Sequence, residues 1–420
     1  MPFREVTLDE VLENREKRVM LQESLLSQYR VPVLSCTMNI PGEVKQTPLV
    51  DFIFRQYMDL VRKTWSGKIL QEVQMDAVTG PEAFFAVDSD ADGIKDSAVA
   101  IESLVPAGRL LDLDVIGTDG KKLSRPEPRT CLVCGGPVNL CSRSRAHGLD
   151  AVKGAAWAIM TSYAVERLSD LAVGALVREA RLTPKPGLVD ENNNGSHQDM
   201  DLAMLLDSAA ALRPYFRFCA EFGLGMARDI NELICAGLEA ENTMLRVTGG
   251  VNTHKGAIYA LGLFLASLGA FLMNGEDPFA VSARLAAAQA VSAPEVRGSH
   301  GALVAAKYQA GGAREEAMEG FPTARKGAGA LKESGGDGLY AFLKILEDIR
   351  DTNLLYRGGP DGLAYVQASA SAVLGMDPDK RKDALLAMDQ ECIRLNISPG
   401  GAADMLALVF LIESAVPQLL

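Results

Sequence analysis

The sequence has little of what marks secreted, disulfide-rich or nucleic-acid-binding proteins. Its seven cysteines are an odd number spread thinly over 420 residues, which argues against a disulfide framework. Positive charge is not in excess: 42 lysines and arginines stand against 54 aspartates and glutamates, and the net charge of −12 argues against general nucleic-acid binding. The N-terminus is charged from Arg4 onward and lacks the apolar core of a signal peptide, so we expect a cytoplasmic protein.

Long apolar runs and linkers are also scarce. One long uncharged run, residues 256–275, has the length needed to span a bilayer. It is rich in glycine, alanine and serine and directly follows a polar motif, so we expect a buried helix and no membrane span. The chain has no Pro/Ser-rich linker, internal repeat or low-complexity tract. Its 48% apolar and 23% charged residues are ordinary for a globular protein, and its length predicts two or three domains.

The character of the sequence changes near residues 150–165. Before this point strand and helix patterns alternate, whereas after it alanine, leucine and glycine dominate and helical patterns follow one another. We therefore predict a mixed α/β domain over residues 1–160 and an all-α domain over residues 161–420. The expected strands lie at residues 31–38, 83–87 and 109–116, and the expected helices at residues 7–26, 48–63, 94–104, 165–182, 201–213, 228–246, 256–273, 279–291, 301–310, 337–350, 361–374, 380–393 and 402–415.

Two aspartates stand out in the first domain, in the segment GRLLDLDVIG. If this segment is a strand, Asp112 and Asp114 share one face, because side chains alternate between faces. Two carboxylates on one face can hold Mg²⁺ together with substrate phosphates, which suits nucleotidyl transfer. An edge strand with two solvated aspartates is the alternative, and the Asp-x-Asp pattern alone favours it.

The segment SCTMNIPGEVK places Thr37, Asn39 and Lys45 around a Pro-Gly turn. A polar strand end, a turn and a lysine can form a phosphate site. Taken alone, the same residues are more often an ordinary exit from a strand into a loop.

A third segment of the first domain combines cysteines with basic residues. Cys131, Cys134, Cys141 and His147 have the spacing C-x2-C-x6-C-x5-H, which is compatible with zinc but equally with buried thiols beside a ligand-binding histidine. From Lys121 to His147, six lysines and arginines accompany one glutamate. Arginine pairs bidentately with phosphate, so we expect this stretch to bind a polyphosphate or an acidic partner. Its arginines are Arg125, Arg129, Arg143 and Arg145.

The second domain carries five polar clusters among apolar helices. The first, TPKPGLVDENNNGSHQDMD, offers a metal–triphosphate site or a general base, although one of its last two aspartates also suits the start of the next helix. The second, TGGVNTHKGA, enters the long apolar helix at its N-terminus, where free N–H groups attract phosphate. The clusters supply Lys185, Asp190, His197, Asp199, Asp201; Gly249, Gly250, Asn252, His254, Lys255; His300, Arg314, Glu316; Asn353, Arg357; and Asp404.

Glu179 lies on the apolar stripe of its expected helix. A buried carboxylate is costly unless it is paired or acts as a ligand. Together with the five polar clusters, this glutamate predicts a shared polar cleft in the helical domain.

These motifs resemble two enzyme families. Residues 30–147 resemble apo-citrate lyase phosphoribosyl-dephospho-CoA transferase in TMNIPGEVK, GRLLDLDV, PRTCLVC and CSRSRAH. Residues 165–410 resemble triphosphoribosyl-dephospho-CoA synthase in KPGLVDENNNGSHQDMD, TGGVNTHKGA, GGAREEAMEGFP and SPGGAADMLA. The synthase family has a sister that serves malonate decarboxylase. The resemblance implies a fusion with the transferase first and with a nucleotidyltransferase-like fold in that half.

The resemblance implies two consecutive reactions. The second domain joins ATP to 3′-dephospho-CoA and releases adenine. The first domain then passes phosphoribosyl-dephospho-CoA to a serine of the citrate lyase acyl-carrier (gamma) subunit and releases pyrophosphate. Neither nucleic acid nor membrane is an expected partner.

The expected residue roles follow these reactions. The expected catalytic residues are Asp112, Asp114, Glu179, His197, Asp199 and Asp201. We expect one Mg²⁺ to bind to Asp112 and Asp114 and a second Mg²⁺ to bind to Asp199 and Asp201. Arg109 joins the other polar residues named above as substrate-binding. Two alternatives remain open, namely a nucleoside hydrolase and one active synthase fused to a non-catalytic carrier-binding module.

Overall fold

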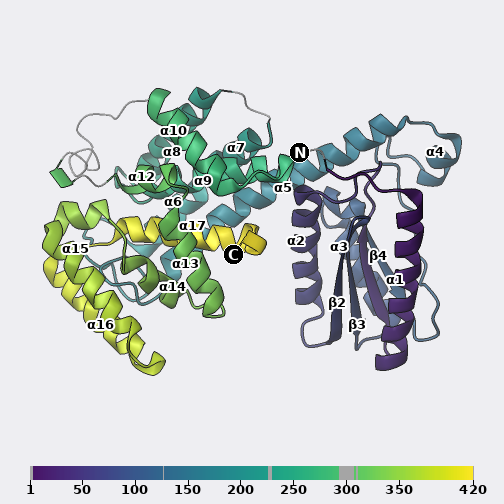
Figure 1. Cartoon of the computed structure of the whole chain (residues 1–420), viewed down its shortest axis with the longest axis horizontal. Helices are drawn as coiled ribbons and strands as arrows, with labels where there is room; N and C mark the ends of the chain where they lie inside the picture. The colour runs from purple at the N-terminus through teal and green to yellow at the C-terminus, as the bar shows by residue number, and fades with distance from the viewer. Residues whose placement is uncertain (1–2, 126, 226–228, 293–306, 309–310, 420) are drawn as a thin grey trace. The chain divides into compact units, whose positions relative to one another are not determined.

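The computed structural model describes residues 3–125, 127–225, 229–292, 307–308 and 311–419 (Figure 1). The chain divides into two compact units. The first comprises residues 1–164 with 272–275, and the second comprises residues 165–271 with 276–420. One long helix, α5 (Leu149–Arg181), contributes to both units.

The first unit is a four-stranded antiparallel sheet with helices. The strands have the order β2-β3-β1-β4, so the prediction of a mixed α/β first part is confirmed. β2 lies at the edge of the sheet and was not predicted, although its apolar and polar residues do alternate. The elements are α1 (Leu8–Tyr29), β1 (Val33–Met38), α2 (Pro48–Thr64), β2 (Ile69–Ala77), β3 (Gly80–Val87), α3 (Ala91–Ser103), β4 (Leu111–Ile116) and α4 (Val138–Ser144).

The sheet has a polar and an apolar face at β4. Asp112 and Asp114 are partly exposed, whereas Leu111, Leu113 and Val115 are buried. Helices α1 and α2 lie on opposite sides of the strands (Figure 1). Helix α1 covers one end of the aspartate face, where its buried leucine packs on three sheet residues. This apolar cluster consists of Leu25, Val33, Phe84 and Ile116.

Helix α3 covers the outer edge of β4. The backbone N–H of Leu113 donates to Glu102 Oε1 at 2.7 Å, and its carbonyl oxygen accepts from Lys95 Nζ at 3.1 Å. Both side chains are buried. Lys95 and Glu102 of α3 therefore satisfy the outward-facing backbone groups of Leu113, which blocks pairing with a further strand at this position.

The second unit is helical, as predicted. The predicted helix at residues 201–213 is confirmed as α6 and ends two residues earlier, because a new helix with Pro214 in its first turn begins at Arg213. Helices α7, α12 and α13 were not predicted, and the predicted helix at residues 301–310 falls largely outside the described residues. The elements after α5 are α6 (Leu202–Ala211), α7 (Arg213–Gly223), α8 (Ile230–Val247), α9 (Lys255–Asn274), α10 (Pro278–Ser292), α12 (Gly312–Met318), α13 (Pro322–Glu333), α14 (Gly338–Leu346), α15 (Thr352–Leu374), α16 (Pro378–Leu395) and α17 (Gly400–Ala415).

Helix α9 is the long apolar run of the sequence. It is the one helix of the described chain that is long and apolar enough to cross a membrane, but 72% of its apolar window is buried inside the protein, as predicted for a core helix. Its contact with α7 depends on glycine. A Cβ atom on Gly223 would lie 1.9 Å from the carbonyl oxygen of Ala266, so the two backbones approach more closely than any side chain would allow.

Candidate active sites

The polar face of the first unit centres on the two aspartates of β4. Thr37 and Ser35 of β1 lie directly across from Asp112 and Asp114, respectively. Asp112 Oδ1 accepts a hydrogen bond from Arg129 Nη2 at 3.0 Å, and Asp114 forms an ion pair with Lys122. The structure thus combines two carboxylates, two hydroxyl side chains and two cations on one face of the sheet.

Glu102 is a functional candidate that the sequence reasoning missed. It is 3% exposed, and burial raises the pKa of its carboxyl group. Arg129 donates to Glu102 Oε1 at 2.8 Å, and Arg125 forms an ion pair with Oε2 at 2.9 Å. Two of the arginines that we expected to bind phosphate are therefore held by one buried carboxylate, and Arg129 also contacts Asp112.

Helix α1 adds a second polar group to the same face. Arg18 Nε donates to Glu82 Oε2 at 2.9 Å, Asn14 Nδ2 donates to Glu82 Oε1 at 2.6 Å, and Gln22 Nε2 donates to Ser35 Oγ at 3.0 Å. Sequence reasoning did not identify these residues. A usable signal was present, since Asn14, Arg18 and Gln22 recur every four residues and so share one side of the helix.

Five other predicted residues of this unit are used elsewhere or exposed. The Asn39 backbone N–H donates to Leu110 O at 2.6 Å, and the Lys45 ammonium group donates to the Ile40 carbonyl oxygen. Arg109 Nη2 donates to the carbonyl oxygens of Thr130 and Cys131, both at 3.0 Å. The two remaining arginines lie at the end of α4 with exposed side chains; they are Arg143 and Arg145.

The second unit contains a cleft of about 1070 Å³. Helices α5, α8, α9, α12, α15 and α17 and the loops between them supply its walls. The cleft brings together most of the residues that sequence analysis selected in this unit. Those that line it are Glu179, Lys185, His197, Asp199, Asn252, His254, Lys255, Arg314, Glu316, Asn353, Arg357 and Asp404.

Carboxylates outnumber cations along this cleft. Nine acidic residues and five lysines or arginines are found among the lining residues. Further charged residues complete the lining: Glu315 and Asp351 belong to the polar clusters of the sequence, whereas Glu241, Asp348 and Arg350 lie outside these clusters. These additional charged residues are Glu241, Glu315, Glu319, Asp348, Asp351 and Arg350.

Four residues that we expected to bind substrate or metal stabilise the local fold and do not line the cleft. Asp190 accepts hydrogen bonds from the backbone N–H groups of Lys185 and Asn192. Asp201 caps α6 by accepting a hydrogen bond from Met204 N at 2.8 Å. Gly249 and Gly250 have positive φ angles and end α8, where Gly250 N donates to Leu245 O at 2.7 Å. A fifth selected residue, His300, lies outside the described residues.

The buried carboxylate of α5 has the partner that its burial required. Glu179 is 6% exposed and forms an ion pair with Lys185, which is 1% exposed. Removing one member of such a pair leaves an uncompensated buried charge, typically at a cost of about 3–5 kcal/mol. The pair joins α5 to the loop that carries His197.

The two histidines of the cleft are uncharged at neutral pH. Burial is the largest cause that lowers the pKa of each imidazole to about 4, assisted by Arg357 at His197 and by Lys185 at His254. Arg357 Nη2 donates to His197 Nδ1 at 3.4 Å, which leaves the proton on Nε2 to be donated to Ser398 Oγ at 2.9 Å. His254 Nδ1 lies 2.9 Å from Ser208 Oγ.

A pair of carboxyl groups lies where α9, α15 and α17 begin. Asp351 accepts from the backbone N–H groups of Asn353 at 2.7 Å and of Ala402 at 2.9 Å, so it is held by two helix N-termini. Asp404 lies beside α9, where a Cβ atom on Gly256 would approach its Oδ2 to 1.9 Å. Burial, with Asp351 and Glu179 nearby, raises the pKa of Asp404 well above its usual range.

The lowered histidine pKa values predict a loss of stability in acid. Unfolded histidine has a pKa near 6.5, so between about pH 6.5 and 4 the unfolded chain binds more protons than the folded one. Stability is therefore complete above this window and falls within it, by up to about 3 kcal/mol for each imidazole. The measurement is the free energy of unfolding by urea from pH 7 to pH 4. We expect this free energy to depend less steeply on pH in His197→Asn than in the wild type. Equal slopes would contradict the assignment, since the acidic groups are common to both proteins.

Two family models together cover almost the whole chain. Residues 6–163 match the model described as apo-citrate lyase phosphoribosyl-dephospho-CoA transferase. Residues 165–417 match the model described as ATP:dephospho-CoA triphosphoribosyl transferase. Both halves of the resemblance seen in the sequence motifs are thereby confirmed.

Two relatives match this chain over nearly its whole length, and a third matches its second half. Protein CitXG of Haemophilus influenzae is 32% identical over 96% of this chain and 95% of its own length. Protein CitXG of Leuconostoc mesenteroides subsp. cremoris is 30% identical over 99% of this chain and 98% of its own. A probable 2-(5''-triphosphoribosyl)-3'-dephosphocoenzyme-A synthase of Pseudomonas fluorescens is 44% identical over 59% of this chain and 91% of its own length. The chain belongs to the CitXG family, in which an apo-citrate lyase phosphoribosyl-dephospho-CoA transferase precedes an ATP:dephospho-CoA triphosphoribosyl transferase.

Proposed function

We propose that this bifunctional transferase makes the citrate lyase prosthetic group in the cleft of its helical unit and attaches it at the aspartate face of its α/β unit. The observation that carries the first assignment is the convergence of twelve selected polar residues on one cleft. The match of the first half to an apo-citrate lyase transferase supports citrate lyase as the acceptor.

The reaction in the cleft exchanges one bond at a ribose carbon for another. The bond between C1 of the ATP ribose and adenine breaks, and C1 is joined to the 2′-oxygen of 3′-dephospho-CoA. Adenine leaves with a proton, the attacking hydroxyl loses one, and the triphosphate stays on the product. This chemistry needs an acid, a base and a triphosphate-binding region, and the cleft supplies carboxyl groups, uncharged imidazoles and cations of these types.

The charge of the cleft supports a requirement for Mg²⁺. Both substrates are polyanions, yet carboxylates outnumber cations in the lining by nine to five. Divalent cations held by substrate phosphates and one or two carboxylates would offset this repulsion. Asp199, whose side chain is 65% exposed in the cleft, is available for such a contact, whereas Asp201 is engaged in capping α6.

The second reaction is assigned to the aspartate face. The serine hydroxyl of the carrier attacks the phosphorus atom nearest the ribose, and pyrophosphate leaves. Asp112 and Asp114 would hold Mg²⁺, which would neutralise charge on the transferring phosphate. Arg129 lies beside Asp112, and Arg125 shares the partner Glu102 with Arg129, so both could bind phosphate oxygens there. The Asp-x-Asp pair on a strand of the antiparallel sheet supports a nucleotidyltransferase-like arrangement. The match to an apo-citrate lyase transferase supports the acyl-carrier (gamma) subunit as acceptor.

Mass spectrometry with the purified full chain tests the whole assignment. ATP and 3′-dephospho-CoA should give adenine and a triphosphoribosyl product, and added apo-carrier should gain phosphoribosyl-dephospho-CoA with release of pyrophosphate. Adenine release that proceeds without dephospho-CoA would instead indicate a hydrolase. Product formation without transfer to any carrier would reduce the first unit to a binding module.

A further inference from the structure

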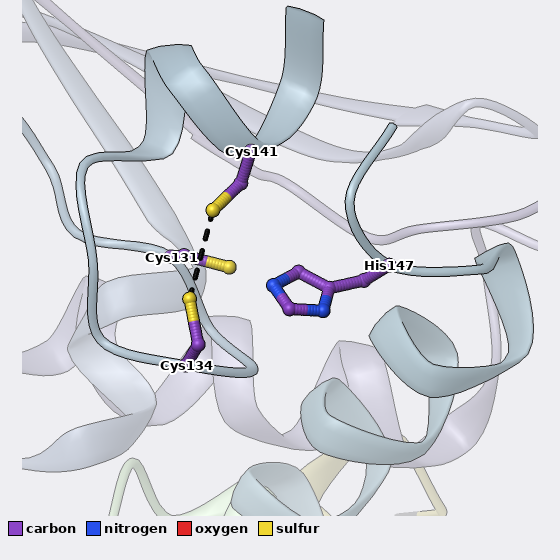
Figure 2. Close-up of side chains that lie close together, drawn as sticks. All are labelled: Cys131, Cys134, Cys141 and His147. Carbon is purple, nitrogen blue, oxygen red and sulfur yellow. Dashed lines mark hydrogen bonds between the residues drawn. The ribbon is translucent and has the colours of Figure 1, made fainter. Parts of the chain in front are cut away.

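Four potential metal ligands converge on the segment that follows the aspartate strand. Cys131 and Cys134 lie in a tight turn, Cys141 lies on α4, and His147 follows that helix (Figure 2). One ligand atom from each of the four lies within 4.8 Å of the others, and the Cys134 and Cys141 sulfurs are 3.6 Å apart. Two sulfurs bound to one tetrahedral zinc at 2.3 Å would be about 3.8 Å apart, close to the distance seen.

His147 supplies a second, independent observation. Its Nε2 atom is buried and has no hydrogen-bond partner. Figure 2 shows the imidazole with one ring nitrogen directed toward the three sulfurs. A buried polar atom without a partner destabilises the folded protein, and a bound cation would relieve that cost. Buried thiols alone would leave this nitrogen unsatisfied.

The segment that carries the four ligands also has little apolar burial. Among described residues from 118 to 155, Cys131 is the one that is buried, and Val133, Val138 and Leu140 are at least 38% exposed. A turn and a two-turn helix with so little apolar burial need a cross-link to hold one conformation. Zinc supplies that in many small folds, since its binding free energy adds directly to folding.

We propose that Cys131, Cys134, Cys141 and His147 bind one structural Zn²⁺, and that this centre positions Arg129 at the transfer site. The three thiols lose their protons on binding, so the centre carries a net charge of −1. All four ligands are protein side chains, which is typical of structural zinc sites, whereas catalytic sites keep a position open.

The link to the transfer site runs through two arginines. Arg109 Nη2 donates to the carbonyl oxygens of Thr130 and Cys131, which ties the start of the turn to the residues preceding β4. Arg129 stands two residues before Cys131; its Nη1 donates to Arg109 O at 3.2 Å and its Nη2 reaches Asp112 at 3.0 Å. A fixed Cys131 therefore fixes Arg129 beside Asp112. This positioning role rests on the proposed transfer function, whereas the metal site does not.

Metal analysis of the full chain, purified without chelator, tests the site itself. We expect one zinc per chain in the wild type and near none in Cys134→Ser and Cys141→Ser. Cys235→Ser is the matched control, because Cys235 is an exposed thiol of α8 and should leave the zinc content unchanged. If the variants fold poorly, the wild type alone still tests the site, because cobalt added to the metal-free protein should give a thiolate–cobalt absorption band. Zinc content near zero in the wild type, with no cobalt band, would overturn the proposal.

A second pair of measurements tests the positioning role. Removing zinc with a chelator should loosen the segment, so that trypsin cleaves faster after Arg143 and Arg145, and should lower carrier transfer at least tenfold, with adenine release unchanged. Restored zinc should recover transfer. If zinc binds stoichiometrically but its removal leaves transfer unchanged, the positioning of Arg129 is wrong while the metal site stands. If a Cys134–Cys141 disulfide forms instead, titration will find five free thiols of seven and no zinc, which overturns both parts.

Discussion

Replacing Asp112 with Asn should lower transfer of phosphoribosyl-dephospho-CoA to the carrier by at least about 100-fold, because a phosphate-bound metal contributes several kcal/mol of charge stabilisation. Asn keeps the shape of the side chain and a hydrogen-bond acceptor for Arg129, but removes the negative charge that a hard cation requires. Asp114→Asn should behave likewise, since both side chains project from the same face of β4. The measurement is transfer of pre-made triphosphoribosyl product to apo-carrier.

The same chain provides two controls for this result. Adenine release belongs to the helical unit and should stay within about twofold of wild type, which shows that the variants are folded. Asp119→Asn removes an exposed acid just after β4, in contact with Lys121, and should change neither activity. Transfer that survives in both Asp112→Asn and Asp114→Asn would refute the metal assignment. Loss of both activities in a folded variant would refute the separation of the two sites.

The sequence was most informative where a local pattern carried the chemistry. Strand alternation alone places Asp112 and Asp114 on one face, because a period of two depends only on backbone geometry. The apolar stripe around Glu179 indicates that this carboxylate needs a partner, which is Lys185. Polar motifs within apolar helices predict a cleft because each motif alone would be costly to bury.

The parts that escaped prediction depend on contacts between distant segments. Glu102 and Glu82 have the sequence pattern of ordinary surface acids, and their burial arises only when α3 and α1 pack on the sheet. Asp351 has the pattern of a helix cap, which it is, but its second contact with Ala402 lies fifty-one residues away in the chain. The sequence predicts Gly249 and Gly250 as a phosphate-binding pair, yet local helix termination fully accounts for their positive φ angles. Sequence spacing alone does not distinguish these two uses of glycine.

Replacing Asp404 with Asn should slow adenine release by about 10²–10⁴-fold, the usual contribution of a positioned proton donor. Three acids meet in this part of the cleft, and they differ in their partners. Glu179 forms an ion pair with Lys185. Burial raises the pKa of Asp351, but this carboxyl group accepts hydrogen bonds from the N-termini of two helices, which partly offset the effect of burial. Asp404 has one backbone contact, at Ala257, and burial and its two acidic neighbours raise its pKa. It is therefore the carboxyl group best suited to keep a proton near neutral pH and to give it to departing adenine.

The pH dependence separates this role from a structural one. A proton donor with a raised pKa is active below that pKa, so adenine release should fall as the pH rises through it. Asp404→Asn, which has no titrating proton there, should lack this fall while retaining ATP binding by calorimetry. Transfer of pre-made product to the carrier should be unchanged, because that reaction uses the other unit. A loss smaller than tenfold, or an unchanged alkaline fall in the variant, would limit Asp404 to holding the N-terminus of α9, where Gly256 already leaves no room for a larger side chain.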